Sequence, residues 1–163
     1  MNQETIKISN RHNTRALAVS VLYSLDINKN LYIDEFEKNV VLESTISDVL
    51  VMSQTEFLSD EFPTLFNVDF LKLLTSKCYL EIEAVDEIIT KSLVKYTIDR
   101  LSFVDRAIIR VATSEMLLGE TPKNIIIDEA LELTKELTNI QDDSQVKFNN
   151  RLLDNIARVI YGK

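Results

Sequence analysis

The sequence predicts an all-α fold of about seven helices, and three observations support this prediction. Only two glycines and two prolines occur among 163 residues, whereas sandwiches and barrels need many turns with special dihedral angles. Apolar residues recur at helical spacing along most of the chain. The composition, 45% hydrophobic and 27% charged, is that of a globular protein. We therefore expect one helical domain over residues 1–163.

The first half of the chain contains three amphipathic segments. Residues 10–27 carry their apolar side chains within one arc of a helical wheel. An acidic segment over residues 34–58, predicted as one helix or two, ends before Pro63. Residues 68–94 form the longest pattern, in which Cys78 is expected to be a small core residue. The other core residues predicted here are Leu17, Ala18, Val21, Leu22, Leu25, Phe70, Leu73, Leu74, Ile82, Val85, Ile88, Ile89 and Leu93.

A further helix is predicted over residues 102–118, with a signal at each end. Ser102 is followed three residues later by Asp105, which is typical of a capping box with Asp in place of Glu. Gly119 is suited to end the helix, and Pro122 follows it. Residues 95–101, "KYTIDRL", are expected to form a short link before this helix.

The last two predicted helices cover residues 124–138 and 145–161. A polar loop separates them and ends in Ser144, which we expect to cap the final helix. The core residues predicted on these helices are Ile126, Ala130, Leu133, Leu137, Phe148, Leu152, Ile156, Val159 and Ile160.

Charge is distributed unevenly along the chain. The formal net charge is -8, and residues 26–61 alone carry a net charge of -7. Residues 1–23 and 147–163 are basic, with net charges of +2 and +3. The total charge argues against an RNA partner, but its distribution permits one.

Arg11 and Arg15 lie near the start of the first predicted helix, where the helix dipole disfavours cations by about 0.3–1 kcal/mol. A helical wheel places both at one edge of the apolar stripe. They either cover apolar surface with their stems or bind phosphate together with the free N–H groups of the helix start. The phosphate interpretation predicts that Arg15→Glu weakens RNA binding without unfolding the protein.

Arg106 and Arg110 are four residues apart and share a helix face. Helix position alone favours a solvated or salt-bridged pair, with Asp105 and Ser114 nearby in sequence, over an anion site.

Adjacent asparagines, Asn149 and Asn150, interrupt the start of the last helix and need a physical reason, because asparagine has low helix propensity. They either hydrogen-bond to nucleotide bases or make interhelical hydrogen bonds. Phe148 beside them either stacks on a base or joins the core with Leu152. The second option is favoured for Phe148.

The sequence offers little for an enzyme. The lone His12 belongs to no catalytic motif, and two glycines exclude a Gly-rich phosphate loop. A single cysteine excludes an internal disulfide and a cysteine zinc site, and it fits a cytoplasmic protein. No apolar run reaches the roughly 20 residues needed to span a bilayer. We expect no catalytic residue, no cofactor and no metal.

Four stretches carry a family resemblance. They are "TRALAVSVLYSLDIN", "VDRAIIRVATSEMLL", "PKNIIIDEALELTKEL" and "KFNNRLLDNIA". Together they resemble the NusB family, in the family's order and over roughly half of the chain. This resemblance implies an all-α fold of two packed helical bundles. It also implies a transcription antitermination factor that binds single-stranded boxA RNA of ribosomal RNA leaders with NusE, a small-subunit ribosomal protein, in the antitermination complex of RNA polymerase.

By position, the resemblance also assigns site residues. Those implied to bind RNA are Arg11, Arg15, Arg106, Lys147, Phe148 and Asn150. Those implied to contact the protein partner are Tyr23, Asp105 and Glu115. No enzyme activity and no cofactor are implied.

The chain departs from the family pattern in several places. Asn149 stands where the family usually has Val, and Arg151 where it usually has Gly. Residues 34–67 show no match. The N-terminal segment also carries fewer basic residues than is usual in the family. These departures keep an alternative open, a helical adapter that binds only proteins. A third interpretation, the RNA-binding appendage of a ribosomal RNA methyltransferase, is disfavoured because no cofactor-binding half accompanies the domain. A homodimer stays open.

Overall fold

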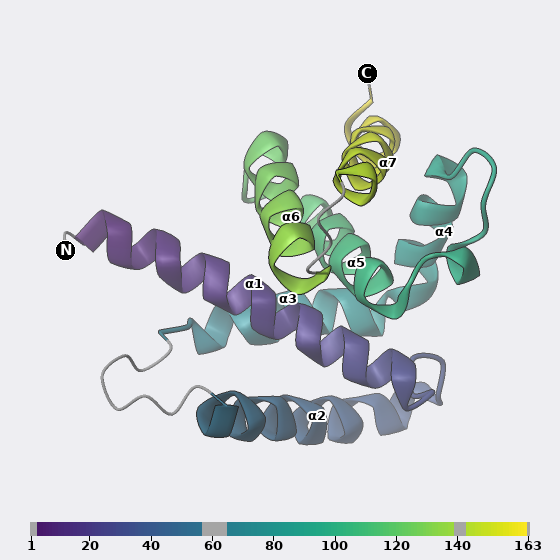
Figure 1. The fold of residues 1–163 in the computed structure, drawn as a ribbon. Helices are drawn as coiled ribbons and strands as arrows, with labels where there is room; N and C mark the ends of the chain where they lie inside the picture. The colour runs from purple at the N-terminus through teal and green to yellow at the C-terminus, as the bar shows by residue number, and fades with distance from the viewer. Residues whose placement is uncertain (1–2, 57–64, 139–142, 163) are drawn as a thin grey trace. The chain divides into compact units, whose positions relative to one another are not determined.

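A computed structural model describes residues 3–56, 65–138 and 143–162 of the chain. These ranges contain seven α-helices, one short 3-10 helix and no strand (Figure 1). The predicted all-α class is therefore confirmed. The helices divide into two compact units, Met1–Leu80 and Glu81–Lys163, and each unit is described by itself. That the chain forms one domain stays a prediction.

Unit 1 contains α1 (Gln3–Ile27), α2 (Glu35–Glu56) and α3 (Val68–Leu80). Each of these helices packs on the other two, and α2 returns beneath α1 (Figure 1). The acidic segment is one helix to Glu56, and its predicted end at Leu58 lies outside the described residues. The predicted core of the first helix is confirmed, because all five of its apolar residues are buried: Leu17, Ala18, Val21, Leu22 and Leu25.

Polar contacts to Tyr79 tie α3 to the chain around the start of α2. The Tyr79 hydroxyl donates a hydrogen bond of 2.6 Å to the carbonyl of Asn30. The Lys38 ammonium donates one of 3.1 Å to the Tyr79 carbonyl and lies 4.6 Å from the centre of its ring. Burial raises the pKa of Tyr79 to about 12. These contacts explain how α2 can keep a lysine on its inner face.

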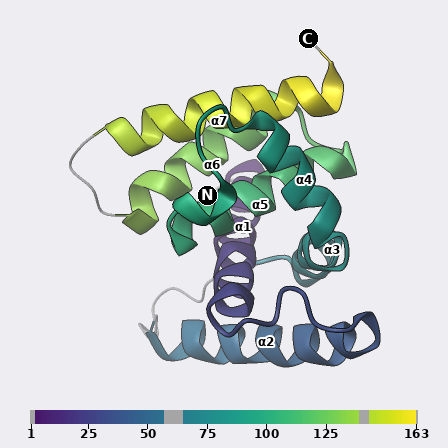
Figure 2. The same ribbon diagram turned by 90° about the vertical axis from the view of Figure 1, so that its right-hand side faces the viewer.

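Unit 2 contains α4 (Ile82–Ser92), η1 (Ile98–Arg100), α5 (Phe103–Leu118), α6 (Lys123–Thr138) and α7 (Ser144–Tyr161). Helix α5 is central, because it packs on α4, α6 and α7. Figure 2 shows α7 lying along α6 on the outer side of this unit. Most of α5 is buried on all sides, which makes it the core of the unit.

Both predicted ends of α5 are confirmed. The Ser102 hydroxyl accepts a hydrogen bond of 3.1 Å from the Asp105 backbone N–H. It also donates one of 2.7 Å to the Asp105 carboxylate. Gly119 has a φ of 72° in the left-handed region and caps the other end, a conformation that glycine adopts at no steric cost.

Three predicted boundaries are wrong. The pattern over residues 68–94 is two helices, because the backbone leaves the helical region at Glu81, where φ is -114° and ψ is 30°. Ser144 is the first residue of α7, and Asp143 occupies the cap position. Helix α1 begins at Gln3, well before the predicted start.

Three predicted core residues are exposed. The exposed fractions are 44% for Leu73, 43% for Leu137 and 45% for Val159. Leu137 and Val159 lie in the last turns of their helices, where the neighbouring helix no longer covers the whole apolar stripe. Cys78 is fully buried, as predicted.

Candidate nucleic-acid interface

The start of α3 is fixed against the middle of α1. The Asn67 side chain accepts a hydrogen bond of 3.0 Å from the Phe70 backbone N–H and so caps α3. The Asn67 N–H donates to the Thr14 hydroxyl oxygen at 2.9 Å. The Asn13 amide donates to the carbonyl of Leu65 at 2.9 Å. This polar joint sets the position of Phe70 relative to α1.

Phe70 is buried beneath two predicted RNA ligands. The guanidinium carbon of Arg11 lies 4.0 Å from the ring centre, and that of Arg15 lies 5.7 Å from it. Such cation–π contacts are worth about 0.5–2 kcal/mol each. Arg15 is only 7% exposed, whereas Arg11 is half-buried. The interpretation that arginine covers apolar surface therefore describes Arg15, and Arg11 is the more accessible cation.

The predicted helix-terminus site for phosphate is wrong. Arg11 lies eight residues after Gln3, which is about 12 Å along a helix. Unpaired backbone N–H groups occur only in the first turn. A phosphate at Arg11 would therefore meet side chains alone.

The two arginines of α5 have different environments. The guanidinium carbon of Arg106 lies 4.3 Å from the ring centre of Phe103, and the ring is 44% exposed. Arg110 is 3% exposed and forms a two-point ion pair with Asp86 of α4, at 2.9 and 3.2 Å. The expected salt-bridged pair is thus confirmed for Arg110, with Asp86 as the partner instead of Asp105.

The start of α7 presents the most accessible of the predicted RNA ligands. Lys147 and Asn150 are exposed, and so is Arg151. Their spacing places all three on one face of the helix. Phe148 is half-buried, with its ring in edge contact with Tyr96 at 5.9 Å between centres and 73° between planes. Phe148 therefore lies at the margin of the core.

Asn149 belongs to the core of unit 2. It is 0% exposed, and its amide donates hydrogen bonds to the Asp105 carboxylate at 3.0 Å and to the Thr134 hydroxyl at 3.1 Å. The Gln145 amide donates to its oxygen at 3.0 Å. The interhelical interpretation is therefore confirmed for Asn149, and it is wrong for Asn150, which is exposed.

Two of the three predicted partner contacts are buried. Asp105 is 5% exposed and Glu115 is 1% exposed, whereas Tyr23 is 37% exposed on α1. Burial, and then the charge of Glu115, raise the pKa of Tyr161, whose hydroxyl donates a hydrogen bond of 3.0 Å to the Met116 carbonyl. The structure corrects the assignment of Asp105 and Glu115 to a partner surface, because both side chains are buried. Tyr23 remains the accessible candidate.

Sequence reasoning missed Tyr96. This residue is 52% exposed and lies in the link between α4 and η1. An aromatic residue directly after Lys95 in a short basic link is the signal that was available, because aromatic and basic side chains alternate in single-strand binders.

In the part of the chain that the structure describes, no group of His, Cys, Asp and Glu is arranged to hold a metal ion. Over the same residues, no helix is long and apolar enough to cross a membrane.

Solved structures share this helical fold. A NusB structure from T. maritima matches with a TM-score of 0.68 and 24% identity, over 91% of this chain and 90% of that one. A crystal structure of antitermination factors NusB and NusE in complex with dsRNA matches with a TM-score of 0.67 and 23% identity, over 91% of this chain and 96% of that one. At these identities the likeness establishes the fold class, a NusB-like arrangement of helices.

The sequence comparisons identify the family. The NusB family model matches residues 12–158, and the chain belongs to the NusB family. The transcription antitermination protein NusB of Staphylococcus epidermidis is 35% identical over 128 residues, which is 78% of this chain and 96% of that protein. The NusB of Staphylococcus aureus strain MRSA252 is 35% identical over 130 residues, which is 80% of this chain and 98% of that protein.

Proposed function

We propose that this chain is a transcription antitermination factor. It binds single-stranded boxA-type RNA of ribosomal RNA leaders together with a NusE-type ribosomal protein, in the cytoplasm and within the antitermination complex of RNA polymerase. Membership of the NusB family supports the proposal. One structural neighbour is a complex of antitermination factors NusB and NusE with dsRNA, which supports RNA and a NusE-type protein as the kinds of partner. No catalytic step and no cofactor are part of it.

The observation that carries the proposal is the start of α7. Lys147 and Asn150 are exposed there, beside the aromatic pair of Phe148 and Tyr96. A lysine attracts phosphate, an asparagine offers both a donor and an acceptor to a base edge, and an accessible aromatic ring stacks on a base for about 1–3 kcal/mol. These are the three contacts that single-strand recognition needs.

Arg11 in unit 1 and Arg106 in unit 2 each offer a further cation for phosphate, and each is described within its own unit. Each guanidinium lies over a phenylalanine ring, Phe70 for Arg11 and Phe103 for Arg106. A guanidinium carries several N–H donors that can bind phosphate oxygens. Arg15, which is more deeply buried, supports the ring and adds positive charge at longer range.

A fluorescence anisotropy titration tests the proposal. A labelled single-stranded boxA-type RNA is titrated with the full chain, with and without the NusE-type protein. We expect binding that tightens when the partner is added and weakens with salt, with a slope of about -0.7 per phosphate contact. The same sequence as a duplex is the control and should bind more weakly. Absence of binding at low salt in both conditions would contradict the proposal.

The buried arginines favour a second candidate function, a helical adapter that binds only proteins. Arg15 and Arg110 are 7% and 3% exposed, so fewer cations face solvent than the sequence suggests, and the net charge is -8. Affinity capture followed by nuclease treatment separates the two functions. Partners that remain after complete RNA removal, with no RNA recovered beforehand, would favour the adapter.

A further inference from the structure

Helix α2 carries exposed apolar side chains on the face opposite the one that packs within unit 1. The inner face packs within unit 1, and its buried residues are Lys38, Leu42, Thr45, Ile46 and Val49. The outer face carries Phe36, Val40 and Val51, which are 81%, 71% and 60% exposed. The three fall within an arc of about 60° on the helical wheel, opposite the inner face. The second stripe therefore needs an explanation outside the core.

The outer stripe runs along most of α2, with the apolar residues Phe36 and Val40 at one end and Val51 at the other. Phe36 and Val51 are fifteen residues apart, which is about 22 Å along the helix. Ser47 lies on the same line between them and is also exposed. Single exposed apolar residues are ordinary on a protein surface, whereas an aligned apolar set bordered by polar residues is typical of an interaction site.

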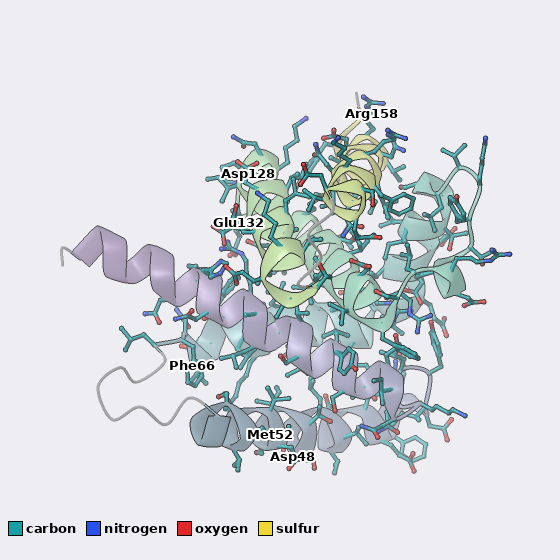
Figure 3. The ribbon with its side chains drawn as sticks, in the orientation of Figure 1. Asp48, Met52, Phe66, Asp128, Glu132 and Arg158 are labelled. Carbon is teal, nitrogen blue, oxygen red and sulfur yellow. The ribbon has the colours of Figure 1, made fainter. Side chains whose placement is uncertain are left out.

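The charges that border the stripe are all negative. Glu37 and Asp48 lie along one side and Glu43 along the other, and all three are exposed. Figure 3 shows Asp48 on the side of α2 that faces away from α1. Among residues 35–53 of α2, where side chains are described, the only base is Lys38, and it is buried. The outer surface of α2 is thus apolar at its centre and acidic at its edges.

From this pattern we infer that the outer face of α2 binds a basic amphipathic helix of a partner protein. Apolar side chains at i, i+3, i+4 and i+7 of that helix would cover Phe36 and Val40. Lys or Arg on its flanks would face the acidic borders, which favours encounter and fixes the register. This surface lies outside the residues proposed to bind RNA and the NusE-type protein, so the inference stands independently of that function.

The negative charge around the stripe favours a basic helix over a second copy of the chain, RNA or an anionic lipid surface. A second copy bound through the same stripe would form an isologous contact and would bring the acidic borders of both chains together, which is unfavourable. RNA and anionic lipid surfaces are negative and would be repelled. A basic helix alone matches both the apolar centre and the acidic edges.

Peptide binding to the full chain tests the inference. The probe is a labelled synthetic helix of about 18 residues, five turns, with leucine along one face and lysine on both flanks. A scrambled peptide of the same composition and a version with glutamate in place of lysine are the controls. We expect anisotropy to report binding of the first peptide only, and the double variant Phe36→Ser/Val40→Ser to weaken it about tenfold. Val94→Ser, which removes a side chain that is 84% exposed in unit 2, should change it less than about twofold.

Three results would overturn the inference. Equal binding of the scrambled peptide would mean that charge alone attracts it. Equal loss in Val94→Ser would mean that the stripe is not the site. A wild-type dimer in analytical ultracentrifugation that Phe36→Ser/Val40→Ser dissociates would assign the face to a second copy. The charge variant Glu37→Lys/Asp48→Lys supplies an independent check, because it should weaken binding of the lysine peptide and strengthen that of the glutamate peptide.

Discussion

Polar residues of both α1 and α7 are predicted RNA ligands, yet the structure gives them different environments. On α1, Arg11 and Arg15 lie over the buried ring of Phe70, and Arg15 is almost fully covered. On α7, Lys147 and Asn150 face solvent. A helical wheel places a residue at the edge of an apolar stripe but does not show how far the neighbouring helix extends. The difference teaches that a cation at such an edge is structural or accessible according to what packs beside it.

The largest expected effect is that of Arg15→Glu on α1. A carboxylate at this position would replace a cation over an aromatic ring with a buried anion, which the ring face repels. We expect the free energy of unfolding to fall by about 3–5 kcal/mol, the range for an uncompensated buried charge. Urea denaturation followed by circular dichroism measures it. This expectation replaces the one drawn from sequence, in which the substitution left stability intact.

Lys147→Glu is the matched charge reversal on α7. Because Lys147 is exposed, its stability should change by less than about 0.5 kcal/mol. If Arg15→Glu were as stable as Lys147→Glu and lost only RNA binding, Arg15 would be a surface ligand and the contrast between the helices would disappear.

The next largest effect on stability is expected in unit 2, where the adjacent Asn149 and Asn150 should respond differently to substitution. Asn149→Ala removes three hydrogen bonds and leaves Asp105 and Thr134 buried with fewer partners. We expect a loss of about 2–3 kcal/mol of stability. Asn150→Ala should leave stability nearly unchanged and weaken RNA binding, because its side chain is exposed. Thermal melts and RNA titrations of both variants measure this, and equal melting temperatures would contradict the assignment.

Much of the fold could be predicted because its signals are local. Periodicity predicted the core of α1, and the Ser102 cap and Gly119 stop fixed α5 to the residue. The break at Glu81 could not be predicted, since no glycine or proline marks it and it falls at the border between the two units. Boundaries set by tertiary packing leave no trace in local composition.

The candidate site was less predictable, because exposure depends on residues distant in sequence. Arg110 is neutralised by Asp86, and Asn149 is held by Asp105 and Thr134. Neither set of partners could be identified from helix periodicity alone. Family resemblance supplied positions, but it did not indicate that Asp105 is occupied inside unit 2.

Lys147→Ala tests whether the exposed residues at the start of α7 bind RNA. Loss of one phosphate contact should weaken RNA binding about fivefold and reduce the magnitude of the salt slope by about 0.7. Titrations at several salt concentrations measure both. Lys123→Ala, which removes another exposed lysine from unit 2, is the control and should leave the slope unchanged. An equal effect of the two variants would mean that RNA responds to overall charge and not to the start of α7.

The smallest effect concerns the phenol of Tyr79, a buried side chain of α3 in unit 1. Its pKa is raised from 10.0 to about 12 by burial, so the folded state holds the proton more tightly than the unfolded state. The resulting stabilisation is complete below about pH 10 and is lost as the pH rises through about 12. Between about pH 9 and about pH 11, wild type should therefore lose up to about 1 kcal/mol more stability than Tyr79→Phe, which has no phenol to ionise.

Tyr79→Phe also lacks the hydrogen bond to Asn30 at every pH, so the comparison is made between the two pH-dependent changes and not between absolute stabilities. Tyr32→Phe, which removes a phenol that is 62% exposed, is the control and should retain the wild-type dependence. If Tyr79→Phe and wild type lost the same stability over this interval, the alkaline sensitivity of unit 1 would have to arise from groups other than its buried tyrosine.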